Sequence, residues 1–306
     1  MIPIPEPDSP PLRRSLLVGW LPDPQGADAL ALADVLAGLL DARPTILRVV
    51  QVAPYLLGDE PEAALERETR EELLGARERL AARDPLTRAV GEPSAARGLF
   101  AEAAREEPVA IVVGSSHRGG FGRVLADSTA TTLLQGAPAA VAVAPLGYAE
   151  REGQAVERIG VAFDDSPESR LALATAVELA VAAGAELTLF TGEVQSPFGY
   201  GPAIEALTAG EVEDAATERA QAILATGIGL VPAELTVSAH RVRAEVGAAL
   251  ERESERLDLL VVGSRGYGPL RRTLLGSVST HLVHHAHCPV VVVPRGAEPE
   301  GPDQPS

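Results

Sequence analysis

The sequence predicts an α/β fold of two tandem domains, each an open-sheet α/β sandwich with a five-stranded, mostly parallel sheet flanked by helices. Short apolar segments alternate with longer segments of helical spacing, and this order occurs twice along the chain. The two halves also match in sequence. With a fixed offset of 149, residues 111–145 align with 260–294 without a gap and share 14 of 35 residues. We therefore interpret the chain as an internal duplication.

In the first half, the apolar segments are short and continuous, as expected of strands buried on both faces of a parallel sheet. The segments between them have helical spacing, and one of them opens with an acid and a proline, which first turns prefer. The predicted elements are, in order, strand 15–20, helix 26–40, strand 44–52, helix 61–83, strand 86–90, helix 92–106, strand 109–114, helix 128–136 and strand 139–145.

The second half repeats this order after a polar segment, 146–157, that has no apolar periodicity. The predicted elements are strand 158–163, helix 166–184, strand 186–192, helix 203–226, strand 233–240, helix 245–256, strand 257–263, helix 277–286 and strand 288–294. We place the domains at 13–146 and 157–295. The ends, 1–12 and 296–306, are rich in proline and acids, and we expect them to be disordered tails.

The amino-acid composition argues against several classes of function. The net charge is −17, which disfavours a nucleic-acid or anionic membrane partner because both need a basic surface. No apolar run reaches the roughly 18 residues of a membrane span, and the first residues lack the apolar region of a signal peptide. The chain has no lysine, which excludes a P-loop and Schiff-base chemistry. With a single cysteine as well, we expect a cytoplasmic protein.

A glycine-rich segment, GSRGYGPLRRTLLGS at 263–277, links a predicted strand to a predicted helix and contains three arginines and no acid. Open parallel sheets bind ligands at the carboxyl ends of their strands, and a helix start attracts anions through its free N–H groups. Gly276 leaves room for a phosphate, Ser277 is the predicted N-cap, and Ser279 and Thr280 add hydroxyls. On composition alone, a phosphate cradle and a plain strand–helix turn fit equally well.

The spacing Gly263-x2-Gly266-x9-Gly276-Ser277, followed by a helix and the strand PVVVVP, resembles the nucleotide-binding branch of the universal stress protein family. The resemblance covers both halves. It implies a Rossmann-like fold of the adenine nucleotide alpha hydrolase-like type, a site for ATP or a related adenine nucleotide, and pairing of two domains through their last strands. It assigns the adenosine contact to Asp164 and the phosphate contacts to Gly263, Arg265, Gly266, Gly276, Ser277, Val278 (through its backbone) and Ser279.

Two readings of Asp164 stay open at this point. Asp165 and Glu168 have the spacing of a capping box for the following helix, which would leave Asp164 facing the ligand. The alternative is that Asp164 is a second acid of the turn.

The first half departs from the pattern at the decisive positions. Leu21 stands where the second half has Asp164, His117 replaces Gly266, and Asp127 replaces Gly276. A carboxylate at that place would repel a phosphate by several kcal/mol at an effective dielectric of about 20. We therefore predict a degenerate nucleotide site in the first domain and an intact one in the second. An anion of another kind at His117 and Arg118 remains an alternative.

The remaining candidates favour structural roles. The segment HLVHHAHC, 281–288, places His281 and His285 four apart, which could chelate a metal, but histidines also suit the last turn of a helix. We predict no metal site, and we expect Cys288 to pack as a small apolar residue. No nucleophile elbow occurs, so we predict no catalytic residue. The apolar strands at 139–145 and 289–294 are expected at sheet edges, where they could pair within the chain or form a homodimer.

These observations predict a stress-response protein that binds ATP in its second domain, with or without Mg²⁺, and acts as a nucleotide-dependent regulatory or interaction module. One alternative is a structural interaction module that binds no nucleotide. A weaker alternative is a slow ATP hydrolase, in which Asp164 or Asp165 holds a metal and Arg265 clamps the phosphates.

Overall fold

The fold was obtained as a computed structural model, which describes residues 14–51, 61–116, 123–151, 155–193, 209–243, 245–264 and 276–294. The predicted tails, 1–12 and 296–306, lie outside the described residues. In the first half, strands and helices alternate as predicted. They are β1 (Arg14–Gly19), α1 (Pro24–Leu39), β2 (Ala42–Gln51), α2 (Pro61–Arg79), β3 (Leu86–Glu92), α3 (Ala95–Glu106), β4 (Ala110–Gly114), α4 (Ser128–Gly136) and β5 (Ala140–Ala144).

The second half repeats the alternation. Its elements are β6 (Arg158–Ala162), α5 (Pro167–Ala183), β7 (Glu186–Gly192), α6 (Ala209–Gly229), β8 (Val237–Val242), α7 (Val246–Glu253), β9 (Leu259–Gly263), α8 (Ser277–His285) and β10 (Val290–Val293). The strand predicted at 233–240 was placed too early, because Pro232 opens a turn that the backbone N–H of Leu235 closes onto its carbonyl at 3.1 Å. The first part of the helix predicted at 203–226 lies outside the described residues.

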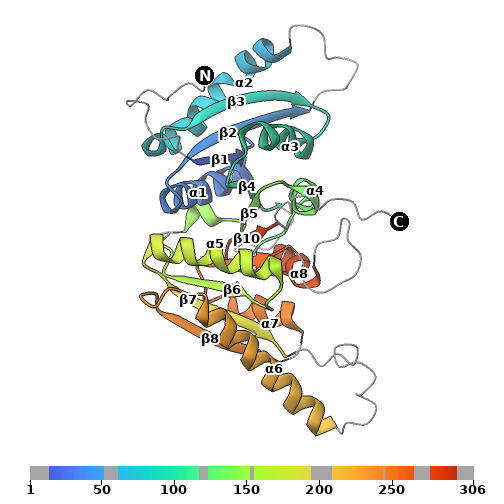
Figure 1. The fold of residues 1–306 in the computed structure, drawn as a ribbon. Helices are drawn as coiled ribbons and strands as arrows, with labels where there is room; N and C mark the ends of the chain where they lie inside the picture. Colours follow the sequence, from blue (N-terminus) through green and yellow to red (C-terminus); the bar gives the residue numbers. More distant parts are fainter. Residues whose placement is uncertain are drawn as a thin grey trace, which may run out of the picture.

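All the strands join one ten-stranded sheet in the order β3-β2-β1-β4-β5-β10-β9-β6-β7-β8. Neighbouring strands within each half run parallel. The halves meet where β5 and β10 pair antiparallel, with Val290 opposite Val143. The predicted fold class, an open and mostly parallel sheet flanked by helices in each half, is therefore confirmed. Figure 1 shows the two halves end to end, with β5 and β10 at the middle.

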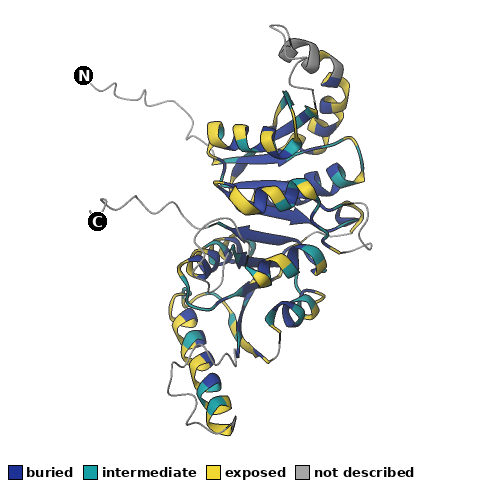
Figure 2. Cartoon of the chain, turned by 90° about the vertical axis from the view of Figure 1, so that its right-hand side faces the viewer, coloured by how far each residue is buried: buried dark blue, intermediate teal, exposed yellow. Residues whose placement is uncertain are grey.

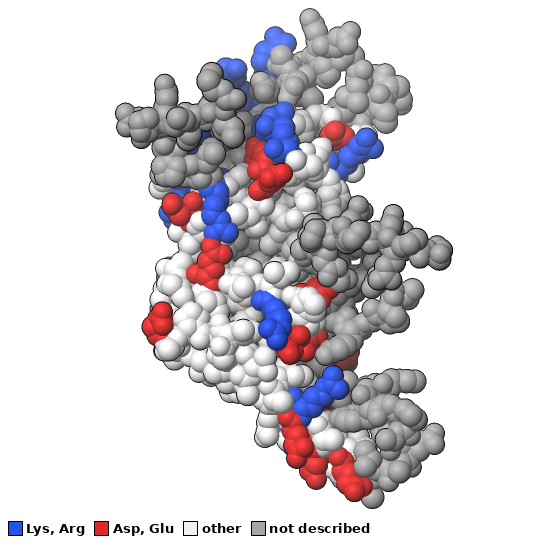
Figure 3. Space-filling model, viewed as in Figure 1, with Lys and Arg blue, Asp and Glu red and all other residues white. Residues whose placement is uncertain are grey.

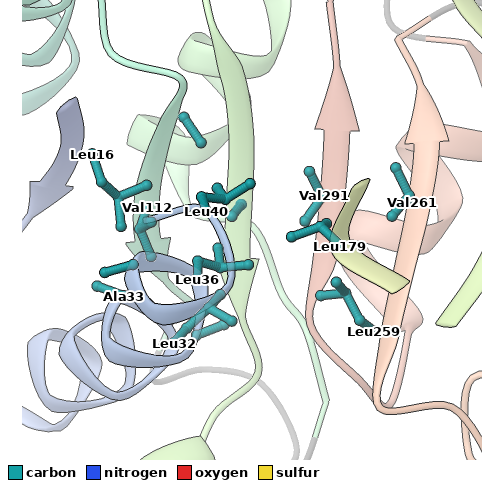
Figure 4. Close-up of a cluster of buried hydrophobic side chains, with 14 of the residues drawn as sticks. Leu16, Leu32, Ala33, Leu36, Leu40, Val112, Leu179, Leu259, Val261 and Val291 are labelled. Atoms are coloured by element: carbon teal, nitrogen blue, oxygen red, sulfur yellow. The ribbon is translucent and has the colours of Figure 1, made fainter. Parts of the chain in front are cut away.

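The central strands of the sheet are buried on both faces, as their continuous apolar sequences require, whereas the outermost strands β3 and β8 are partly exposed. One face carries Leu36 of α1 and Leu173 of α5 in a core that extends across both halves. The opposite face is covered by α3, α4, α7 and α8, with Leu133 and Leu282 fully buried. Figure 2 shows the buried strands between helices whose outer faces are exposed, and Figure 4 shows part of the first core. No helix in the described part of the chain is long and apolar enough to cross a membrane.

Hydrogen bonds hold the segment after β5 against α1, and others connect the two halves beyond the β5–β10 pair. Asp28 of α1 is buried, and its carboxylate accepts from the backbone N–H groups of Gly147 and Ala149, each at 2.8 Å. In the first half, Val124 and Ala126 donate their N–H groups to the carbonyls of Ala286 and Val283, at 2.7 and 2.8 Å. These bonds satisfy carbonyls at the end of α8, which would otherwise lack intrahelical partners. The first half therefore supports α8 directly.

Candidate functional site

The candidate site lies at the carboxyl ends of β6 and β9. These strands are neighbours, and their register places Val161 opposite Val261. Beyond β6 the chain enters α5, which covers one face of the sheet, whereas beyond β9 it reaches α8 on the opposite face. Two adjacent strands whose connections leave to opposite faces form a topological switch point, the usual ligand crevice of such sheets. The chain therefore brings Asp164 and the described ends of the glycine-rich segment to the same edge of the sheet.

The turn from β6 into α5 is organised by Asp164. Its Oδ1 accepts from the backbone N–H of Ser166 at 3.1 Å and from the Ser166 hydroxyl at 2.5 Å. Ser166 in turn caps α5 by accepting from the N–H of Ser169. The predicted capping box of Asp165 and Glu168 is wrong: Asp165 has a left-handed φ of 66° and pairs with Arg170 at 2.6 Å. Asp164 thus has a defined structural role, and a ligand contact at this residue remains a proposal.

Close packing between β9 and α5 explains why residue 263 is glycine. A Cβ at this position would lie 2.9–3.0 Å from the backbone and Cβ of Glu168, in the first turn of α5. The corresponding Gly114 is tighter still, with its notional Cβ 2.1 Å from the carbonyl oxygen of Gln25. Because α1 and α5 both pass this close to a strand end, the glycine common to the two halves is explained by helix–strand packing alone. A phosphate contact at Gly263 needs other support.

The ends of the glycine-rich segment are held together. The carbonyl oxygen of Ser264 accepts from the N–H of Gly276 at 2.7 Å and from the hydroxyl of Ser279 at 3.3 Å. Ser279 is buried and also donates to the carbonyl of Gly276. The Ser279 hydroxyl is therefore hydrogen-bonded to backbone carbonyls at both ends of the segment. The two remaining predicted contacts, Arg265 and Gly266, lie outside the described residues.

The start of α8 differs from the prediction. Ser277 is the exposed first residue of the helix, and the N-cap is Gly276, which offers no side-chain acceptor. The N-terminal N–H groups of an α-helix have no partners within the helix, and they carry the positive end of its dipole. In α8 the N–H groups of Ser277, Val278 and Ser279 occupy these positions. Within the described residues, no side-chain cap is formed at the start of α8, and the N–H groups of such a helix start are suited to an anion.

The start of α4, the counterpart in the first half, is capped by its own carboxylate. Asp127 is the N-cap, and its Oδ1 accepts from the N–H of Ala130 at 2.8 Å. The other oxygen accepts from the side-chain amide of Gln25 at 3.0 Å. A carboxylate thus occupies the place that an anion would take at an uncapped helix. The substitution at this position, which the sequence alone reveals, changes the chemistry of an otherwise matching site.

Sequence reasoning missed Gln25. Its amide nitrogen donates to Asp127 and also to the carbonyl of Gly114 at 2.9 Å, so one side chain links α1, β4 and α4. The counterpart in the second half is Glu168, which is buried in the first turn of α5. The pair could have been found by extending the alignment of Leu21 with Asp164 by four residues. The neutral amide of Gln25 is hydrogen-bonded to the cap of α4, and an acid holds the corresponding position in the second half.

His281 of α8 packs against α7, and the ring of His285 lies against that of His281. The Nε2 of His281 is 2.7 Å from a carboxylate oxygen of Glu251, and the rings of His281 and His285 lie 4.6 Å apart. Burial lowers the pKa of His284, and the charges of His285 and His281 lower it further. Within the described residues, no group of three or more histidine, cysteine or acidic side chains is placed to hold a metal.

Arginine and acidic side chains are interspersed on the surface of the described residues that Figure 3 shows. Ion pairs between described residues include Arg43 with Asp84 at 2.7 Å and Arg158 with Asp258 at 3.0 Å.

The profile of the Universal stress protein family matches the chain twice, at residues 13–145 and 155–294. The chain belongs to the universal stress protein family. Two matches in succession confirm the predicted tandem organisation. The order of strands and helices described above is the same in both matched segments, so each copy is a complete α/β unit.

Relatives of known name agree with this assignment. A universal stress protein of Mycolicibacterium smegmatis is 33% identical over 188 residues, which are 60% of this chain and 60% of that protein. The chain therefore matches less than two thirds of that relative's length. A universal stress protein of Thermus aquaticus is 34% identical over 134 residues, 44% of this chain and 95% of that protein.

Among solved structures, a universal stress protein from Archaeoglobus fulgidus superposes with a TM-score of 0.63, covering 92% of this chain and 98% of its own. Its sequence identity is 18%, so it supports the fold of the whole tandem unit.

Proposed function

We propose that this universal stress protein binds ATP in its second domain, residues 157–295, and that the nucleotide regulates its conformation or its contacts with partners. The observation that carries the proposal is the N-terminus of α8, where Gly276 supplies no side-chain cap and donates its N–H to Ser264 at the end of β9. The first half fills the corresponding place with the carboxylate of Asp127. Phosphate is the natural occupant of free N–H groups at a helix start.

Different residues at this edge of the sheet would contact different parts of the nucleotide. The N–H groups of Ser277, Val278 and Ser279 would receive the phosphates, and Gly276 adds no side chain in their path. Asp164, at the end of the neighbouring strand, would contact the adenosine. Arg265 and Gly266 would complete the phosphate contacts from the loop.

Magnesium fits this arrangement as a companion of the nucleotide. The described residues contain no cluster of three metal-binding side chains. Mg²⁺ in proteins is commonly held by one or two carboxylates together with the phosphates of its substrate. We therefore propose that Mg²⁺, where it takes part, arrives on the phosphates of ATP.

The direct test begins with protein as it is purified. The chain is denatured, the supernatant is assayed for adenine nucleotide, and the nucleotide-free protein is then titrated with ATP by calorimetry. Adenosine serves as the matched ligand without phosphates. The proposal expects ATP to bind clearly more tightly than adenosine. Absence of binding at millimolar ATP, or equal affinity for adenosine, would overturn it.

A further inference from the structure

The degenerate edge of the first domain retains a pocket. It opens at the carboxyl ends of β1 and β4 and has about 50 Å³ of free space. Its walls are mostly apolar, and they include Trp20, Leu21, Leu47, Val49 and Leu99. Three polar side chains, those of Gln25, Asp127 and Thr129, line the same space. Every residue that lines it belongs to the described part of the chain.

At two positions of this pocket, the polarity of the residue is opposite to that of its counterpart in the second domain. Leu21 lies two residues beyond the end of β1, as Asp164 lies two residues beyond β6, so an apolar side chain stands in place of an acid. At the start of the helix, the first domain has an acid, Asp127, where the second domain has Gly276. The nucleotide proposed for the second domain would use a polar contact at the first position and free N–H groups at the second. The pocket offers neither.

What the pocket offers is an apolar wall and an acceptor. Asp127 uses one oxygen for the N–H of Ala130 and the other for the amide of Gln25. An ionised carboxylate has about four acceptor positions, so two protein donors leave capacity for another N–H donor. A cationic donor makes the stronger hydrogen bond to a carboxylate. The net charge of −17 also raises the local concentration of cations.

The size of the pocket limits the ligand. A water-sized sphere needs about 10–15 Å³ of such space, so a volume of about 50 Å³ suits a short alkyl chain and not a nucleotide. We propose that the first domain binds a small aliphatic ammonium ion, with its alkyl group on the apolar wall and its ammonium group at Asp127. This inference is independent of nucleotide binding in the second domain.

Trp20 makes the inference testable in the full-length protein. It is the chain's single tryptophan, it is 8% exposed, and it lines the pocket. The tryptophan emission is followed while the protein is titrated with 3-methylbutylammonium at constant ionic strength. The matched compounds are the neutral 3-methylbutanol and the anionic 4-methylpentanoate. We expect a saturable change with the ammonium ion, affinity weaker by about tenfold or more for the alcohol, and no response to the carboxylate.

Two variants separate charge from space. Asp127→Asn keeps a good helix cap and removes the charge, so it should abolish the preference for the ammonium ion over the alcohol. Ala95→Leu places a larger side chain in the pocket and should abolish both responses, whereas Ala101→Leu, at an exposed position of the same helix, should change neither. The inference is overturned if the ammonium ion gives no saturable change, if the alcohol binds equally well, or if Asp127→Asn keeps the preference.

Discussion

Replacing Gly276 by aspartate copies the first domain's helix cap into the second. The backbone permits it, because Gly276 has φ −62° and ψ 153°, an extended conformation close to that of Asp127 at φ −78° and ψ −174°. Aspartate is a better N-cap than glycine by a few tenths of a kcal/mol. We therefore expect Gly276→Asp to fold normally and to be slightly more stable than the original chain.

The same substitution should strongly weaken nucleotide binding. In α4 the Asp127 carboxylate lies 2.8 Å from the N–H of Ala130, so a carboxylate at position 276 would take the N–H that a phosphate oxygen needs. A phosphate displaced to about 4–8 Å from that carboxylate is repelled by about 2–4 kcal/mol at a dielectric of about 20. This corresponds to a loss of roughly 30-fold to 1,000-fold in affinity.

Gly276→Asn is the matched control, because asparagine has nearly the same shape and also caps helices, but it carries no charge. Calorimetric titration with ATP, alongside urea unfolding of each variant, separates the charge from the added volume. The reasoning is refuted if Gly276→Asp is folded and binds ATP as tightly as Gly276→Asn or the original chain.

Three further predictions concern stability and reactivity. Asp28→Ala leaves the N–H groups of Gly147 and Ala149 without their acceptor, and urea unfolding should show a loss of about 2–4 kcal/mol, with a smaller loss for Asp28→Asn. The pKa of His284 is lowered in the folded chain, so the folded chain binds fewer protons at this residue than the unfolded chain does. The free energy of unfolding should therefore fall as the pH drops below 6.5, and His284→Gln should reduce that fall. Equal shifts of the urea midpoint with pH in the two proteins would contradict this. Complete burial raises the pKa of the Cys288 thiol to about 12, so a thiol reagent should label it only after unfolding, and rapid labelling of the folded chain would disprove the burial.

The fold could be predicted from the sequence because its evidence is local and repeated. Continuous apolar strands such as β4 and β9 require burial on both faces, and the gapless alignment of the halves makes each support the other. Boundaries were less accurate where a single turn decides them. The start of β8 depends on the hydrogen bond between Leu235 and Pro232, which apolar spacing does not reveal.

The candidate site was predictable only in its outline. The alignment showed that Asp127 stands where the second half has Gly276. The structure shows that Asp127 is the N-cap of α4, whereas Gly276 provides no side-chain cap for α8. Which serine caps a helix depends on the path of the backbone, so Ser277 was misassigned as a cap and Ser166 was overlooked. The contact of Gln25 with both β4 and α4 joins residues about a hundred positions apart, and no local pattern encodes it.

The stoichiometry of ATP binding tests the central claim most directly, because the claim assigns different roles to two copies of one fold. Calorimetry of the nucleotide-free full-length chain should give one ATP per chain, and Gly276→Asp should bind that ATP roughly 30-fold to 1,000-fold more weakly. Two ATP molecules per chain would contradict the closure of the first site by Asp127. No ATP bound to the original chain at millimolar concentration would contradict the uncapped start of α8 as a phosphate site.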